Sequence, residues 1–346
     1  MCSYFVSYTL DLSYFHDGYK TKPYIEPFWI HEPYSFYPKA IPTKQPDFKT
    51  SNREIPLNQN QSETAQWLQK MENRYADEIQ TIKSVCKRYH EKSFPGINLK
   101  DLMIDNYFHW GYCPNAKVGT STWVEHFVKL MRTEKRPDRF DGSFGKQVNS
   151  KRSKLRNFFR VPINSVHQNY GSKLITKSIL SDYLVESSIL MFSFVRHPFE
   201  RLVSTYTGKV VGRNKDWLHF NLKSFPDFIQ FVLKQHKEGD MNKHVKPFVE
   251  RCQYCKIPYD VIGRIETFDE DVKYIIMKNK LEDVLPLEET LGLHKNEHGK
   301  NTTEERERHS LELFSELDKQ EIQQLYEIYK MDFEMFRYNV SAYFRL

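Results

Sequence analysis

The sequence of 346 residues predicts an α/β protein with an open parallel sheet flanked by helices. In two stretches, an apolar or aromatic run is followed by a short turn and then by apolar residues at helical spacing. These stretches are YFHWGYCPNAKVGTSTWVEHFVKLMR and SSILMFSFVRHPFERLVSTYTGK. Strand–turn–helix units of this kind build parallel sheets, and such sheets bind ligands at the carboxyl ends of their strands.

The composition is that of a folded globular chain. Hydrophobic residues make up 39% and aromatic residues 15%, with 25 Phe and 21 Tyr against 13 Gly, which excludes a low-complexity or wholly disordered chain. No stretch approaches the ~20 apolar residues that span a bilayer, and the N-terminus has no basic flank before an apolar core. As written, the chain is expected to be soluble.

Changes in composition divide the chain into three regions. Residues 1–60 are rich in Pro and Tyr, and because repeated prolines exclude long helices and central strands, we expect an extended leader. Residues 61–100 are a helical lead-in, since apolar residues recur every three or four positions from Ser62 to His90. Residues 101–346 carry both strand–turn–helix units and form the main domain.

Within the main domain, the second unit contains the clearest strand. The apolar run from Ile189 to Val195 fits a buried parallel strand, and Pro198 suits the first turn of the helix that follows. YDVIGRIE is a further short strand candidate, while FPDFIQFVLKQH and ELDKQEIQQLYEIYKMDFEMFRYN are expected to be helical. No internal repeat is present in the sequence.

The first turn, NAKVGTSTW, has the residues of an anion site. A helix beginning near Gly119 or Thr120 would direct its unpaired N–H groups and positive dipole end toward the end of the strand. Gly119 permits close backbone approach, and Lys117 supplies a mobile positive charge. The pattern is neither G-x-x-x-x-G-K-[ST] nor G-x-G-x-x-G. A purely structural capping role is the alternative.

The second turn, VRHPFERLVS, places an arginine directly after the buried strand. The guanidinium of Arg196 is suited to bidentate phosphate recognition, and Ser204 lies about two helical turns further on. The structural alternative is an ion pair of Arg196 with Glu200 or Glu266 that only ties elements together. Because both turns follow neighbouring strands, the sequence favours two anion-binding turns over coincidence.

The cysteines leave the redox state open. There are five, at Cys2, Cys86, Cys113, Cys252 and Cys255, too few for a disulfide scaffold and odd in number. The Cys-x-x-Cys pair in RCQYCKIPYD could be half of a zinc site, a redox pair or a local disulfide. No second such pair and no close His pair completes a tetrahedral site, so zinc is disfavoured and no metal is expected.

A basic stretch contributes much of the formal net charge of +6. Eleven Lys or Arg lie between Lys129 and Arg160, against three carboxylates, and such a stretch should attract polyanions, although most charge runs are solvated loops. Interleaved aromatic residues make a nucleic-acid-binding protein the main rival prediction; they are Phe140, Phe144, Phe158 and Phe159. No helix-turn-helix, zinc-finger or RNA-binding signature accompanies them, so no nucleic-acid partner is expected.

Several segments resemble one known family. KVGTSTW and FSFVRHPFERLVSTY are similar to the 5′-phosphosulfate- and 3′-phosphate-binding motifs of Golgi carbohydrate sulfotransferases, the group that contains the chondroitin and dermatan 4-O-sulfotransferases. Further similar segments are VPINSVH, RCQYCKIPYDVIGRIETFDEDVKYI and LYEIYKMDFEMFRYN, so the resemblance spans about Asp105 to Asn339. The chain departs from the family at Ala116, where proline is usual, and lacks a Trp that commonly precedes the Cys-x-x-Cys region.

The resemblance implies a P-loop-like, sulfotransferase-type sheet and transfer of a sulfuryl group from 3′-phosphoadenosine-5′-phosphosulfate (PAPS) to a sugar hydroxyl. It implies that Lys117 stabilises the leaving group and that Arg196 and Ser204 hold the 3′-phosphate. The residues implied to bind PAPS are Ala116, Lys117, Val118, Gly119, Thr120, Ser121, Thr122, Arg196, Pro198, Glu200, Arg201 and Ser204.

The resemblance also singles out a general base. His167 in VPINSVHQNYG lies where the family carries a matching histidine, and a side chain titrating near neutrality suits removal of the hydroxyl proton. Glu200 and His197 are further candidates that the sequence does not decide between, although Glu200 is better suited to orienting Arg196.

The resemblance also implies an acceptor and a cellular location. It implies an acidic glycan acceptor and a type II membrane protein of the Golgi lumen, but the N-terminal anchor is absent from this sequence, so a truncated or soluble form is expected. Sequons at Asn60, Asn301 and Asn339 would be used only in a secretory lumen. An inactive PAPS-binding relative stays open as an alternative to an enzyme.

Overall fold

A computed structural model describes residues 59–89, 99, 102–142, 151, 154–155, 177–292 and 302–346. The chain divides into two units, Met1–Pro56 and Leu57–Leu346, and every described residue belongs to the second. The leader expected over residues 1–60 thus lies almost entirely outside the described residues.

A four-stranded sheet with the order β1-β2-β3-β4 forms the centre of the second unit. Its strands are β1 (Met103–Asp105), β2 (Trp110–Cys113), β3 (Leu190–Val195) and β4 (Val261–Arg264). β2, β3 and β4 are parallel, with Tyr112 opposite Phe192 and Phe192 opposite Val261. The predicted strands at the aromatic run, at the apolar run and in YDVIGRIE are therefore confirmed, and so is their parallel pairing.

The sheet is mixed, whereas the sequence predicted a parallel one. β1 runs antiparallel to β2, with Met103 opposite Tyr112. The two strands are joined by only four residues, and a connection this short joins antiparallel strands, since a parallel crossover needs a dozen or more. Three residues are too few for a periodic pattern, so β1 left no recognisable signal in the sequence.

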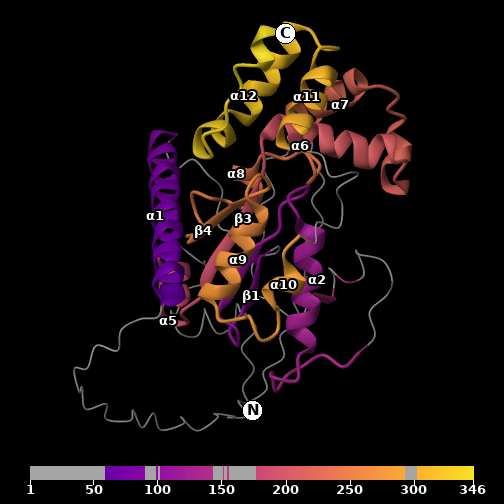
Figure 1. Cartoon of the computed structure of the whole chain (residues 1–346). Coiled ribbons are helices and arrows are strands. Elements are labelled where there is room, and N and C mark those ends of the chain that lie inside the picture. Colours follow the sequence, from indigo (N-terminus) through magenta and orange to yellow (C-terminus); the bar gives the residue numbers. More distant parts are fainter. Residues whose placement is uncertain are drawn as a thin grey trace, which may run out of the picture. The chain divides into compact units, whose positions relative to one another are not determined.

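Helices surround the sheet. They are α1 (Gln59–Arg88), α2 (Thr120–Arg132), α5 (Lys177–Glu186), α6 (Pro198–Thr205), α7 (Phe225–Glu238), α8 (Phe248–Arg251), α9 (Phe268–Lys278), α10 (Leu287–Thr290), α11 (Thr303–Phe314) and α12 (Lys319–Met335), with a π-helix η2 (Tyr206–Val211) and 3-10 helices η3 (Lys215–Phe220) and η4 (Tyr343–Arg345). Figure 1 shows α6, α7, α11 and α12 gathered beyond one end of the strands.

The predicted helices have the local signals that start and stop helices. Ser224 and Asp227 form a capping box at the start of α7, and Gly239 ends that helix in the left-handed conformation. Asp318 and Glu321 form a second capping box at the start of α12. Both helices predicted from apolar spacing are thus confirmed, as is the long N-terminal one, which is α1.

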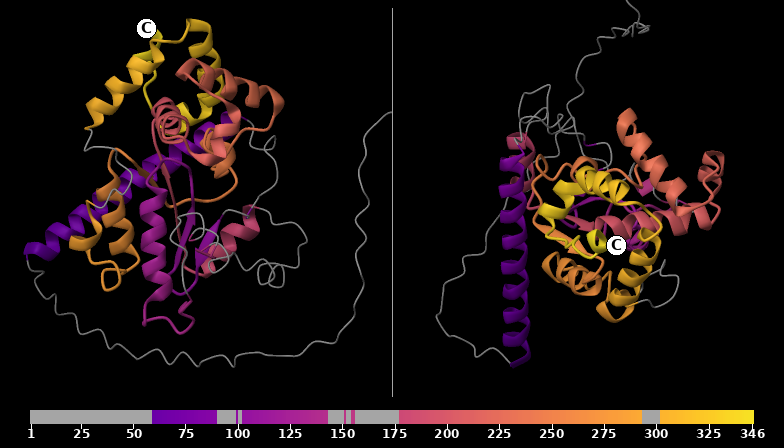
Figure 2. Two further views of the ribbon diagram at one scale, coloured as in Figure 1. Left: turned by 90° about the vertical axis from the view of Figure 1, so that its right-hand side faces the viewer. Right: turned by 90° about the horizontal axis from the view of Figure 1, so that it is seen from above.

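Two hydrophobic clusters hold the unit together. The larger one surrounds the sheet and includes Trp110, Phe127 and Phe192, all at most 1% exposed. The second joins α6, α7, α11 and α12 through residues such as Phe199 and Leu325, both fully buried. β3 leads directly into α6, so the carboxyl ends of the parallel strands face the helical cluster (Figure 2). Ligands of open α/β sheets bind at this end.

Two disulfides cross the unit. Cys86 of α1 is bonded to Cys255, and Cys113 at the end of β2 is bonded to Cys252. Each cysteine of the Cys-x-x-Cys pair is therefore joined to a distant part of the chain, so the pair is neither a local disulfide nor a zinc half-site.

Two features are absent from the described residues. None of their helices combines the length and apolarity needed to cross a membrane. They also contain no group of three or more His, Cys, Asp or Glu side chains placed to hold a metal ion.

Candidate functional site

A buried asparagine fixes the turn that follows β2. Asn115 is 1% exposed, and its amide donates to the Tyr254 hydroxyl at 2.9 Å and to the Phe194 carbonyl at 3.0 Å. The Thr120 hydroxyl in turn donates to the Asn115 carbonyl. These bonds join the turn to β3 and to the disulfide-linked segment, so the turn is held in one conformation.

Glycine is required where this turn enters α2. Gly119 caps the helix with φ 73° and ψ 8°, in the left-handed region, and a Cβ there would overlap the ring of Phe268 at the start of α9. Because Gly119 has no side chain, the N-cap residue itself bonds none of the first amides of α2. The N-terminal amides and the positive dipole end of the helix lie at the end of β2, as the sequence predicted.

Lys117 is partly buried beside two other cations. Its pKa is lowered from 10.5 to about 8 by burial and by the positive charges of Arg196 and Lys209. Lys117 belongs to the turn after β2, Arg196 to the end of β3 and Lys209 to η2. Three positive charges from three elements thus gather at one edge of the sheet, where an anion would relieve their mutual repulsion.

A glycine in the π-helix makes room for the lysine. η2 continues α6 without a break, and a Cβ on Gly208 would lie 2.6 Å from Nζ of Lys117. The ammonium group therefore rests against bare backbone. Short π-helical segments occur frequently at functional sites, and in this one Gly208 and Lys209 both lie next to Lys117.

Arg196 forms an ion pair with the helix that follows it. Its Nε and Nη2 atoms each lie 3.3 Å from Oε2 of Glu200, and the two side chains are 12% and 8% exposed. Of the two structural partners expected for Arg196, Glu200 is the one found, and it orients the guanidinium at the start of α6. At 3.3 Å the contact is longer than a strong charge-assisted hydrogen bond. Ser204 lies one turn beyond Glu200 on the same helical face.

His197 has a structural role at the start of α6. Burial lowers the pKa of His197 to about 4. Nε2 lies 3.0 Å from the Asn339 carbonyl oxygen, and Nδ1 accepts from the Glu200 amide at 3.4 Å. Because a carbonyl only accepts, Nε2 carries the proton of a neutral ring. Both ring nitrogens form hydrogen bonds with backbone groups, so His197 is poorly placed to act as a general base.

Arg201 is fully buried and holds a loop. Its guanidinium donates to the Lys246 carbonyl at 2.8 Å and to the Val245 carbonyl at 3.4 Å, and it lies 3.9 Å from the ring centre of Phe248. On the other side of the loop, Asp332 of α12 accepts from the Phe248 amide at 2.6 Å. Residues 245–248 are thus fixed between α6 and α12. Contact of Arg201 with PAPS stays a prediction.

The remaining residues predicted to contact PAPS differ in exposure. The buried ones are Val118, Thr120, Thr122 and Pro198. The partly exposed ones are Ala116, Ser121 and Ser204. The hydroxyls of Ser121 and Ser204 are therefore the best placed of this set to bind an anion directly.

The predicted general base, His167, lies outside the described residues, and its role stays a prediction. Two of the three sequons cannot be placed for the same reason, since the Asn60 side chain and Asn301 are also outside the described part. Asn339 is exposed, and its Oδ1 accepts from the Ser341 amide at 2.9 Å.

The basic stretch is largely ion-paired where the structure describes it. Arg136 is 4% exposed and bonds Asp105 at 2.6 Å, and Lys151 bonds Glu125 at 2.8 Å. The sequence prediction counted only carboxylates inside the stretch, whereas Asp105 and Glu125 come from outside it. These pairs weaken the prediction that the stretch attracts polyanions.

Sequence reasoning missed Gly208 and Lys209 as parts of the site. Both come shortly after the second turn, in RLVSTYTGK, and a Gly-Lys pair just beyond a predicted anion-binding turn is the only signal that the sequence offered. Their proximity to Lys117 depends on the π-helix and on the β2–β3 pairing, which local sequence does not specify.

An α/β sheet with cations and a helix N-terminus at the carboxyl ends of its strands is an arrangement that suits an anionic ligand. The model of a family described as "Sulfotransferase family" matches residues 100–339, and the chain belongs to this family.

Curated relatives agree with this assignment. Carbohydrate sulfotransferase 11 of Mus musculus is 26% identical over 274 residues, covering 72% of this chain and 70% of the relative. Carbohydrate sulfotransferase 10 of Xenopus laevis is 23% identical over 303 residues, covering 78% and 77%. Carbohydrate sulfotransferase 12 of Mus musculus is 26% identical over 275 residues, covering 70% and 61%. No solved structure matches the chain significantly.

Proposed function

We propose that this protein transfers a sulfuryl group from PAPS to a hydroxyl of a glycan, with a P-loop-like turn after β2 holding the phosphosulfate. The observation that carries the proposal is the position of the Lys117 ammonium beside Arg196 and Lys209 at the N-terminus of α2. A donor with a phosphosulfate at one end and a 3′-phosphate at the other complements such a site. The carbohydrate sulfotransferase relatives support a glycan as acceptor.

Lys117 would stabilise the leaving group. As the bond to sulfur breaks, negative charge grows on the bridging oxygen of the departing phosphate. A cation at that oxygen lowers the energy of the transition state more than that of the bound substrate, which is the requirement for a faster chemical step. The fixed turn and the bare backbone at Gly208 would hold Lys117 in place for this task.

Arg196 and Ser204 would hold the 3′-phosphate, with Glu200 orienting the guanidinium. By binding the donor away from the reacting sulfur, they would fix its orientation without taking part in the chemistry. His167 would accept the proton of the attacking hydroxyl.

The disulfides favour the secretory route. Stable disulfides persist in oxidising compartments, and two of them join distant segments of this chain. Together with the family resemblance, they support the Golgi lumen as the place of action.

The proposal is tested by incubating the protein with sulfate-labelled PAPS and chondroitin, dermatan, heparan and a neutral glycan. Transfer of label to at least one glycan is expected. PAPS binding without transfer to any of them would instead favour an inactive relative. Salt-sensitive binding of oligonucleotides without PAPS affinity would favour the nucleic-acid alternative.

A further inference from the structure

The Cys-x-x-Cys segment is cross-linked on both sides of one tyrosine. Cys252 is bonded to Cys113, the last residue of β2, and Cys255 is bonded to Cys86 of α1. Tyr254 lies between these two cross-links, so the backbone that carries its side chain is fixed both to the sheet and to a helix. The chemistry proposed for the two turns does not use this segment.

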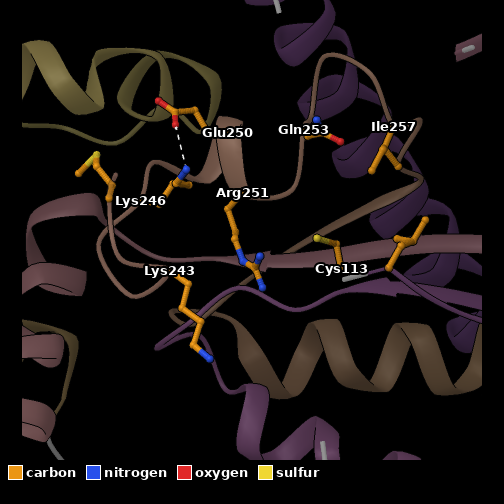
Figure 3. A pocket seen from close by; sticks show the side chains of 9 residues that line it. Cys113, Lys243, Lys246, Glu250, Arg251, Gln253 and Ile257 are labelled. Atoms are coloured by element: carbon orange, nitrogen blue, oxygen red, sulfur yellow. Dashed lines mark ion pairs between the residues drawn. The ribbon is translucent and has the colours of Figure 1, made fainter. Parts of the chain in front are cut away.

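The side chain of Tyr254 lies inside the protein. The segment borders a pocket of about 270 Å³, and Figure 3 shows Cys113 and Gln253 among the side chains that line it. Tyr254 is 4% exposed and is not one of the lining residues. Any role of its hydroxyl therefore depends on other protein groups and not on a substrate bound in this pocket.

A chain of buried hydrogen bonds connects this hydroxyl to the end of β2. The amide of Asn115 donates to the Tyr254 hydroxyl at 2.9 Å, and this hydroxyl donates to Oγ of Ser193 at 2.9 Å. Oγ of Ser193 donates in turn to the Cys113 carbonyl at 3.0 Å. The four residues are between 0% and 4% exposed. Each hydroxyl both accepts and donates, and a buried network that is paired in this way holds one arrangement.

The backbone of Lys117 depends on support of this kind. Its φ angle is 69°, in the left-handed region that residues with a side chain seldom adopt. Such a conformation persists only where the surrounding structure holds it. Lys117 is flanked by Asn115 two residues earlier and by the fully buried Val118. The Thr120 hydroxyl closes the turn by donating to the Asn115 carbonyl. Asn115 is thus the anchor of the turn on the side of β2.

We propose that Tyr254 is a positioning residue for Lys117, and that it acts through Asn115 to keep the ammonium group where the leaving phosphate would lie. The inference rests on the proposed function and deepens it, because it gives the Cys-x-x-Cys segment a part in catalysis without contact to either substrate. Loss of the Tyr254 hydroxyl would remove one partner each from Asn115 and Ser193, and the turn could then relax from its left-handed conformation. The ammonium group would move away from the bridging oxygen, and small displacements at a reacting centre are costly.

The test replaces Tyr254 by phenylalanine in the full chain, which keeps the ring and removes only the hydroxyl. We expect kcat for sulfate transfer to fall about tenfold and KM for PAPS to change much less, since a displaced cation matters most in the transition state. The peptide that contains the turn should also exchange its amide hydrogens faster, which mass spectrometry measures without any substrate.

A second variant breaks the same chain of hydrogen bonds from β3. Ser193→Ala should lower kcat and speed amide exchange of the turn as Tyr254→Phe does. Because both substitutions interrupt one chain, the double variant should be little slower than either single variant.

Tyr259→Phe is the matched control. The Tyr259 hydroxyl donates to the Cys252 carbonyl at 2.7 Å, and the rings of Tyr259 and Tyr254 lie 4.8 Å apart. This variant removes the same buried group from the same segment and leaves the bonds of Asn115 in place. It should lower the melting temperature about as much as Tyr254→Phe does, while kcat and the amide exchange of the turn stay unchanged.

Three results would overturn the proposal: an unchanged kcat in Tyr254→Phe, equal losses of kcat in Tyr254→Phe and Tyr259→Phe, or fully additive losses when Tyr254→Phe is combined with Ser193→Ala. The proposed function fails separately, if the unaltered chain transfers no sulfate to any glycan. In that case the amide exchange still decides whether Tyr254 holds the turn.

Discussion

At the scale of single residues, the site depends on where one ammonium group is held. Lys117 is placed by a turn that Asn115 anchors and by a backbone that Gly208 leaves uncovered. Its pKa of about 8 reflects the cost of keeping a cation partly buried next to two others. Binding of an anion would offset this cost, which supports the proposal that the ligand of Lys117 brings negative charge.

Gly208→Ala should reduce transfer without unfolding the protein. The new Cβ would meet Nζ of Lys117 at 2.6 Å, and because Nζ is the end of a flexible side chain, the fold can accommodate the methyl group while the ammonium moves. We expect kcat to fall by at least ~10-fold with little change in melting temperature, since small displacements at a reacting centre are costly. Steady-state kinetics and thermal unfolding measure both. Gly212→Ala is the control, because the three atoms nearest its Cβ would be backbone atoms of Thr207 and Gly208 and not Lys117; an equal loss there would contradict a specific effect on Lys117.

Substitution of a residue proposed to bind the donor and substitution of the proposed base should affect donor affinity and turnover differently. Arg196→Ala should weaken binding of adenosine 3′,5′-bisphosphate about tenfold or more, since it removes a cation that would hold the 3′-phosphate. His167→Ala should leave that affinity unchanged and reduce transfer by ~10²–10⁴-fold, the usual contribution of a general base. Calorimetry and sulfate-transfer rates test the pair. Unchanged turnover of the His167 variant would reject it as the base.

At the scale of elements, three segments meet to make the cation cluster: the turn after β2, the end of β3 and the π-helix η2. The two turns could be predicted because each follows a local strand–turn–helix pattern. The proximity of Lys209 to Lys117 could not be predicted. It follows from the pairing of β2 with β3 and from the change from α-helix to π-helix after Thr205.

The cluster predicts a particular pH dependence of donor binding. Lys117 attracts an anion fully only while protonated, so affinity for adenosine 3′,5′-bisphosphate should be greatest well below pH 8 and should fall as the pH rises through 8, by up to about tenfold per pH unit. Lys209→Met removes a neighbouring positive charge and should therefore raise the pKa of Lys117 and shift the fall to higher pH. Titrations from pH 7 to 9.5 test this, with Lys237→Met as control. An affinity that stays flat over this range would show that Lys117 does not hold the ligand.

At the scale of the whole molecule, the sequence predicted the elements that have a local periodic pattern. It did not predict the contacts between residues that are far apart in the chain. The parallel strands, α2, α6 and α12 each have a local period or a cap. β1 is too short for a period, and Arg136 is neutralised by Asp105, 31 positions earlier. The same limit applied to the cysteines, whose partners are 169 and 139 residues apart. No local spacing encodes such a pairing.

The disulfide that joins Cys86 to Cys255 should contribute to global stability. It ties α1 to the segment between α8 and β4, and by closing a loop of 169 residues it restricts the unfolded chain. Cys86→Ser with Cys255→Ser should lower the free energy of unfolding by ~2–5 kcal/mol, measured by urea titration.

Peptide mapping without reduction should recover both cross-links, Cys86–Cys255 and Cys113–Cys252. Because each bond needs a partner more than a hundred residues away, a fragment linking Cys252 to Cys255, or alkylation of all four cysteines without prior reduction, would contradict this packing of α1 and β2 around the Cys-x-x-Cys segment.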